Sequence, residues 1–110
     1  MKSSSWRTQL RKGALELVLL LLLEREELYG YELVKRLKAA AEIDTSEGTI
    51  YPILSRLRKD GLIRSRWIEP ESGVPRKYYR ITEAGSAALE EMIDAWRSLS
   101  DSIGNLLEKR

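Results

Sequence analysis

The side chains of this 110-residue chain that could take part in chemistry are hydroxyls and cations, and they gather around residues 46–80. The chain has no cysteine and no histidine, which removes thiolate nucleophiles, imidazole bases, disulfides and the usual zinc ligands. It has no glycine-rich phosphate loop, and the acidic run 24–27 is typical of a solvated helix end. We therefore expect no catalytic residue, no metal ligand and no cofactor, which leaves the chemistry of binding.

Residues 55–80 form a basic zone in a chain whose net charge is only +2. This stretch contains eight cations and three anions, a balance of +5, which leaves −3 for the rest of the chain. A local basic zone in a near-neutral chain indicates one surface that faces an anionic partner. The competing interpretation is a solvated charged face.

A helix is predicted from the N-cap residue Ser46 (or Thr45) to Gly61, which suits the position after a helix end. Apolar residues at helical spacing give it a core face: Ile50, Ile53, Leu54 and Leu57. The opposite face is small and ends in cations: Gly48, Pro52, Ser55 and Lys59, with Tyr51 and Arg56 at its flanks. Such a face predicts a helix that lies in the DNA major groove.

The elements around this helix fit a DNA-binding unit. A second helix, starting at residues 28–30 and ending near 42, precedes it across the short turn 43–45, with Tyr31, Leu33, Val34 and Leu37 as its core face. Strands are predicted at 62–68 and 76–82 around the turn 69–75. A helix pair followed by a basic hairpin is the plan of the winged helix-turn-helix.

The hydroxyls and amides at the start of the third helix can donate to a phosphate, and Arg76 and Lys77 follow the tip of the hairpin. For these two cations, the alternative is a solvated hairpin edge. We expect Trp67 to pack the hairpin onto the body, and one of Tyr78 and Tyr79 to be buried. The predicted DNA contacts are Ser46, Gly48, Thr49, Tyr51, Ser55, Arg56, Lys59, Arg76 and Lys77.

The most apolar run lies in a predicted first helix, residues 6–25, after a polar start that we expect to be frayed. Its fully apolar part, 17–23, is much shorter than the roughly 20 residues of a membrane span, so no membrane partner is expected. A helix that is apolar on all sides is usually buried between layers. We expect its own domain on one side and a second subunit on the other.

A last helix is predicted from the N-cap residue Thr82. Its apolar residues alternate in steps of three and four, as in a coiled-coil seam: Leu89, Met92, Trp96, Leu99, Ile103 and Leu106. The alternative is a helix packed on its own domain, but the first three helices already close a winged core. We therefore expect a homodimer, with an interface or effector site at Leu15, Leu19, Leu89, Met92, Trp96, Leu99 and Ile103.

Several ordered motifs resemble the PadR-type transcriptional regulators in their short form, across roughly residues 10–97. They are residues 46–52 (SEGTIYP), 56–57 (RL), 60–63 (DGLI) and 76–85 (RKYYRITEAG), with 29–33 (YGYEL) upstream. The resemblance implies a mostly α fold with a small β-hairpin, in which a winged helix-turn-helix (1–82) precedes a C-terminal dimerisation helix (83–110). Some short members stack planar aromatic ligands on a tryptophan at the dimer interface, which here corresponds to Trp96.

From residues and resemblance together we expect a cytoplasmic homodimeric repressor that binds double-stranded DNA. A small planar or apolar effector would release it. Two alternatives stay open: a winged-helix module that binds a protein and not DNA, and a DNA-binding dimer with no ligand.

Overall fold

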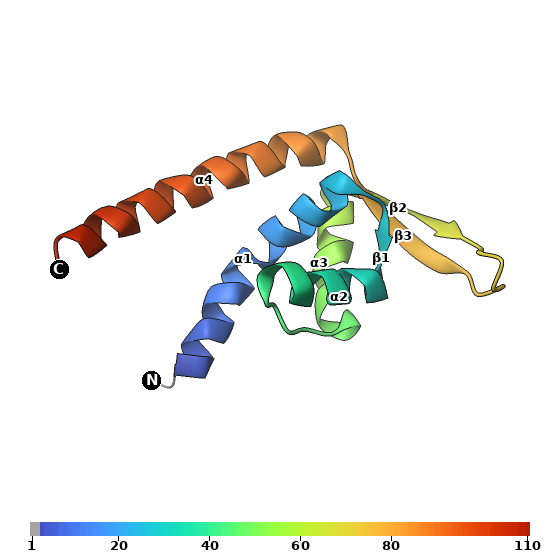
Figure 1. Ribbon diagram of the computed structural model, residues 1–110. Coiled ribbons are helices and arrows are strands. Elements are labelled where there is room, and N and C mark those ends of the chain that lie inside the picture. The colour runs from blue at the N-terminus through green and yellow to red at the C-terminus, as the bar shows by residue number, and fades with distance from the viewer. Residues whose placement is uncertain (1–2) are drawn as a thin grey trace.

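The computed structural model describes residues 3–110 and folds them into four helices and a small sheet that lies at one side of them (Figure 1). The elements in chain order are α1 (Ser3–Arg25), β1 (Leu28–Tyr29), α2 (Gly30–Ala41), α3 (Glu47–Lys59), β2 (Ile63–Ile68), β3 (Arg76–Ile81) and α4 (Glu83–Glu108). The predicted fold class is confirmed: a mostly helical winged helix-turn-helix with an added C-terminal helix. No helix within residues 3–110 is both long and apolar enough to cross a membrane.

The core lies where α1 meets α2, α3, the sheet and the start of α4. Leucines of α1 supply its centre, and Leu19 and Leu20 are fully buried. α1 begins at Ser3, inside the stretch that we expected to be frayed, and residues 1–2 lie outside the described part of the chain. The fraying stays a prediction.

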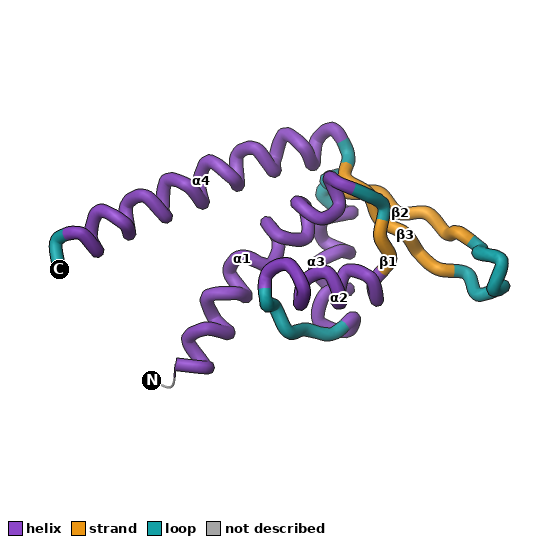
Figure 2. The backbone as a smooth tube through the Cα atoms, in the orientation of Figure 1, coloured by secondary structure: helices purple, strands orange, loops and turns teal. Residues whose placement is uncertain are grey.

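The sheet is antiparallel with the order β1-β3-β2. Leu28 pairs with Tyr79 on one side of β3, and Trp67 pairs with Lys77 on the other. The hairpin β2–β3, called the wing below, projects from the body on the side away from the C-terminus (Figure 2). Residues 28–29, predicted to start a helix, form β1 instead, because their backbone pairs with β3.

Both predicted ends of α3 and the predicted start of α4 are confirmed. Ser46 caps α3, where its Oγ accepts a hydrogen bond from the Thr49 amide at 3.3 Å. Gly61 follows α3 with a φ of 77°, the left-handed region that favours glycine. Thr82 caps α4 by accepting from the Gly85 amide at 3.0 Å, and its hydroxyl donates to the Gly61 carbonyl at 2.6 Å.

Gly85 sets how closely α4 approaches the body. A Cβ at this position would lie 1.9 Å from the backbone oxygen of Leu62 and 2.7 Å from a side-chain carbon of Ile81. The same Leu62 oxygen accepts a hydrogen bond from the Thr82 amide at 3.0 Å. The first turn of α4 is therefore fixed against the start of β2.

The rest of α4 leaves the body and gives the molecule its long axis (Figure 1). Met92 and Ile93 still pack partly on the core, but the apolar residues beyond them are exposed: Trp96, Leu99, Ile103, Leu106 and Leu107. Three residues expected at a dimer interface, Leu15, Leu19 and Leu89, are instead buried within the chain's own core. They offer almost no surface to a second copy, because α1 packs against α2, β3 and α4 of its own chain.

Candidate nucleic-acid interface

The outer face of α3 is exposed as predicted. The residues of α3 and its cap that were expected to contact DNA are all open to solvent: Ser46, Gly48, Thr49, Tyr51, Ser55, Arg56 and Lys59. At the start of the helix the Ser46 and Thr49 hydroxyls lie 3.1 Å apart. Two hydroxyls beside the free amides of a helix N-terminus can donate to one phosphate.

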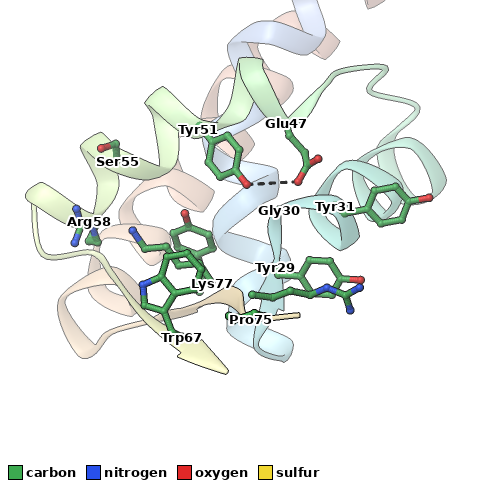
Figure 3. Close-up of a pocket in the computed structure, with 12 residues that line it drawn as sticks. Tyr29, Gly30, Tyr31, Glu47, Tyr51, Ser55, Arg58, Trp67, Pro75 and Lys77 are labelled. Carbon is green, nitrogen blue, oxygen red and sulfur yellow. Dashed lines mark hydrogen bonds between the residues drawn. The ribbon is translucent and has the colours of Figure 1, made fainter. Parts of the chain in front are cut away.

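A groove of about 720 Å³ separates α3 from the wing (Figure 3). Its walls combine aromatic rings, three cations and one carboxylate. The residues that line it are Tyr29, Gly30, Tyr31, Glu47, Tyr51, Ser55, Arg58, Trp67, Pro75, Arg76, Lys77 and Tyr79. We call this space the α3–wing groove.

Gly30, at the start of α2, lines one part of the groove and lies close to two side chains of α3. A Cβ on Gly30 would lie 3.0 Å from Glu47 Oε1 and 3.1 Å from Tyr51 Oη. These two atoms are themselves joined, since the Tyr51 hydroxyl donates to Glu47 Oε1 at 3.4 Å. Gly30 thus allows α2 to lie against the first turns of α3 and lets both side chains reach the groove.

Two phenols inside the groove stay neutral and can act as hydrogen-bond donors. Burial, together with the Glu47 carboxylate, raises the pKa of Tyr51 above its ordinary value. Burial also raises the pKa of Tyr79; the nearby Tyr51 adds to that rise and Arg58 opposes it. Tyr79 is the buried member of the predicted pair, while Tyr78 is half-buried, with its ring centroid 5.2 Å from that of Tyr29.

Aromatic rings lie beside two cations of the wing, Arg76 and Lys77. The Arg76 guanidinium lies 4.7 Å from the centre of the Tyr29 ring, and Lys77 Nζ lies 6.0 Å from that of Tyr79. Cations are attracted to the faces of aromatic rings at such distances. Both charges therefore line the groove from the wing side.

Two ion pairs tie α1 and its C-terminal end to the elements that flank the groove. Arg56 of α3 pairs with Glu16 of α1, and the hydrogen bond between them raises the pKa of Arg56. Arg66 of β2 holds Glu27 through two bonds of 2.7 and 2.8 Å, which lowers the pKa of Glu27. Arg56, expected to face DNA, is thus already bound to a carboxylate of α1.

A second groove, of about 710 Å³, lies between the first half of α1 and the turn from α2 to α3. It contains cations from α1 and α2, but carboxylates compensate two of them. Arg11 pairs with Glu42 at 3.5 Å, and Lys38 pairs with Asp44 at 3.6 Å. Its lining carries four cations and two carboxylates, the same net charge of +2 as the α3–wing groove, but two of its four cations are paired with carboxylates.

The structure places two aromatic residues differently from the sequence-based expectation. Trp67, expected to pack the wing onto the body, is 69% exposed and lines the groove. Tyr31, expected in the core, is 52% exposed in the first turn of α2.

Arg58 lines the groove but was not among the predicted contacts. Tyr51, Ser55 and Arg58 recur at helical spacing along one face of α3, and this pattern could have identified Arg58. Within residues 3–110 no group of three or more metal-ligating side chains exists.

Comparison with known proteins agrees with this arrangement. The model of the transcriptional regulator PadR-like family matches residues 18–91. The chain is similar to a PadR family transcriptional regulator from Eggerthella lenta, with 43% identity, a TM-score of 0.86, and coverage of 97% of this chain and 93% of that one. A PadR-like transcriptional regulator from Bacillus cereus has 41% identity and a TM-score of 0.81, with coverage of 90% and 96%.

Among curated relatives, the transcriptional regulator YqjI of Escherichia coli is 40% identical over 81 residues, which are 72% of this chain and 37% of YqjI. The chain thus spans little more than a third of that protein's length. The family match covers the helix-turn-helix, the wing and the start of α4, which are the elements that build the exposed face of α3 and the groove beside it. The chain belongs to the PadR-like family of transcriptional regulators.

Proposed function

We propose that this transcriptional regulator binds double-stranded DNA with α3 in the major groove and the wing beside it. The observation that carries the proposal is the exposed, small-residue face of α3 next to a groove with three cations and one carboxylate. Of the contacts expected from sequence, we retain as the DNA-binding set Ser46, Gly48, Thr49, Tyr51, Ser55, Lys59, Arg76 and Lys77. Arg56 is left out because Glu16 holds it.

Binding of duplex DNA as a function of salt tests this proposal. Each phosphate contact adds about one unit to the slope of log affinity against log salt. Alanine at Lys59, Arg76 and Lys77 should therefore flatten the slope by about three units, while alanine at Arg25, Lys109 and Arg110 serves as a control that removes equal charge. A folded triple variant that keeps the parent's slope would overturn the assignment, and failure of the parent to bind would favour a protein-binding module.

We further propose that the chain acts as a homodimer through α4. The supporting observation is the exposed row of its last turns, where Trp96 is 54%, Leu99 61% and Leu106 67% exposed. An apolar row at steps of three and four needs a partner helix, and a second copy related by a two-fold axis supplies the same row. We keep the division into a winged helix-turn-helix, 1–82, and a dimerisation helix, 83–110. Because the first turns of α4 pack on the body, the part of α4 that is free to contact a second copy begins after about Ile93.

We also propose that the protein is a repressor and that a small effector releases it from DNA. Trp96 would lie near its symmetry mate and offer a flat apolar face to a planar or apolar compound. Effector binding would shift the dimer between two spacings of its α3 helices and lower DNA affinity, in the cytoplasm where we place the protein.

The effector site has its own test in Trp96→Ala. If Trp96 lines a pocket, the variant should keep its dimer and DNA affinity but lose the stabilisation that a planar aromatic dye gives the parent. No stabilisation of the parent by the dye would favour a DNA-binding dimer without a ligand.

A further inference from the structure

This inference rests on the proposed function and concerns what fills the α3–wing groove when the protein binds DNA. The major and minor grooves of B-DNA are separated by the sugar–phosphate backbone of one strand. A protein that places a helix in the major groove and a wing beside it must therefore straddle that backbone. We infer that the α3–wing groove is the channel for one DNA strand, with Arg58 as a phosphate ligand and Trp67 as an apolar wall.

The charges of the groove fit a polyanion. Arg58 contributes from α3, and Arg76 and Lys77 contribute from the wing, so cations face each other across the channel. The one carboxylate of the lining, Glu47, already accepts a hydrogen bond from Tyr51. Figure 3 shows Arg58 and Lys77 toward the same end of the opening and Glu47 toward the other.

Arg58 is the cation of α3 that is free to serve this channel. Arg56 is held by Glu16, and Lys59 does not line the groove. Within residues 3–110 no carboxylate lies at ion-pair distance from Arg58, and its side chain is exposed. A guanidinium that lines a groove and is not paired with a carboxylate can bind a phosphate through two parallel hydrogen bonds.

Trp67, in β2, gives the wing side of the groove an apolar surface opposite Arg58 of α3. Its side chain is 69% exposed, and it pairs in register with Lys77 on the neighbouring strand. A large exposed indole beside a cation matches a backbone in which charged phosphates alternate with apolar sugar faces. The bound strand should therefore cover Trp67 and exclude water from it.

The salt dependence of DNA binding tests Arg58. With a mixed-sequence duplex as probe, Arg58→Ala should lower the salt slope by about one unit and weaken binding roughly tenfold near 0.1 M salt. Arg64→Ala removes the same charge from β2 outside the groove and should leave the slope unchanged. Arg58→Lys should restore most of the slope, since the contact requires a charge.

Acrylamide quenching of tryptophan fluorescence tests whether bound DNA covers Trp67. DNA should reduce the quenchable fraction in the parent. At saturating DNA this reduction should disappear in Trp67→Phe, because the remaining tryptophans, Trp6 and Trp96, lie outside the groove. If DNA binds normally but Arg58→Ala keeps the parent's slope and Trp67 stays quenchable, the inference is wrong while the proposed function stands. If the parent binds no duplex at all, both are wrong.

Discussion

In α1, Leu15, Leu19 and Leu23 are at most 5% exposed, whereas in α4 Trp96, Leu99 and Ile103 are 47–61% exposed. Both rows repeat at helical spacing. α1 is covered by α2, β3 and the first turns of α4, while the last turns of α4 extend beyond every other element (Figure 1). Two rows of similar spacing thus differ in what surrounds them: the chain covers the α1 row itself and leaves the α4 row exposed.

Leu19→Ala should give the largest effect, because it opens a cavity in the core of the body. We expect the free energy of unfolding to fall by about 2–5 kcal/mol. Chemical denaturation of the variant and the parent measures the loss. The loss should be the same at every protein concentration, and a loss below about 1 kcal/mol would contradict a self-contained core.

Gly85→Ala tests the junction between the two rows. The added methyl would meet the Leu62 oxygen, a backbone atom that also accepts from Thr82, so either α4 or β2 must shift. We expect a loss of about 1–3 kcal/mol in unfolding free energy. Ser86→Ala, one residue further along α4, is the control; equal stability of Gly85→Ala and the parent would show that the junction can adjust freely.

Glu27→Gln probes the ion pair that holds the wing to the end of α1, and its effect should be about 0–1 kcal/mol at neutral pH. Because Arg66 lowers the pKa of folded Glu27, the pair stabilises the fold above the unfolded pKa, near 4.5. That stabilisation is lost as the pH falls through the lower folded pKa. The difference in melting temperature between parent and variant should therefore shrink below pH 4.5, and a difference that grows instead would reverse our assignment.

Leu99→Glu should change the stability of the isolated chain least, within about 0.5 kcal/mol, since it alters an exposed position. Its effect should be on association. The melting temperature of a dimer rises with protein concentration, and the variant should lose this dependence. Glu90→Ala, on the exposed side of the same helix, serves as the control. A concentration-independent melting temperature in the parent would mean that no second copy covers α4.

Features that depend on residues adjacent in the chain were predictable from the sequence. The caps Ser46 and Thr82 and the left-handed Gly61 depend on a few adjacent residues, and the wing strands have their own turn between them. The exposed face of α3 followed from its spacing. These are the features that place the α3–wing groove.

Features set by contacts between distant segments were not predictable from the pattern. β1 exists because Leu28 and Tyr29 meet β3, and Arg56 turns to Glu16, which is 40 residues away. Leu89 and Leu99 look alike in the seam, but only Leu89 lies near the body. Periodicity identifies an apolar face, and only the arrangement of the elements decides what covers it.

Hydroxyl-radical footprinting of a bound promoter fragment tests the central claim most directly, namely that a dimer joined at α4 presents two α3 helices and two wings to DNA. We expect two protected half-sites related by a two-fold axis, with centres separated by about 10 base pairs or a multiple of that. Each half-site should include protection of one backbone strand between the regions of α3 and the wing. A single protected segment without two-fold symmetry, or no protection at all, would contradict the account.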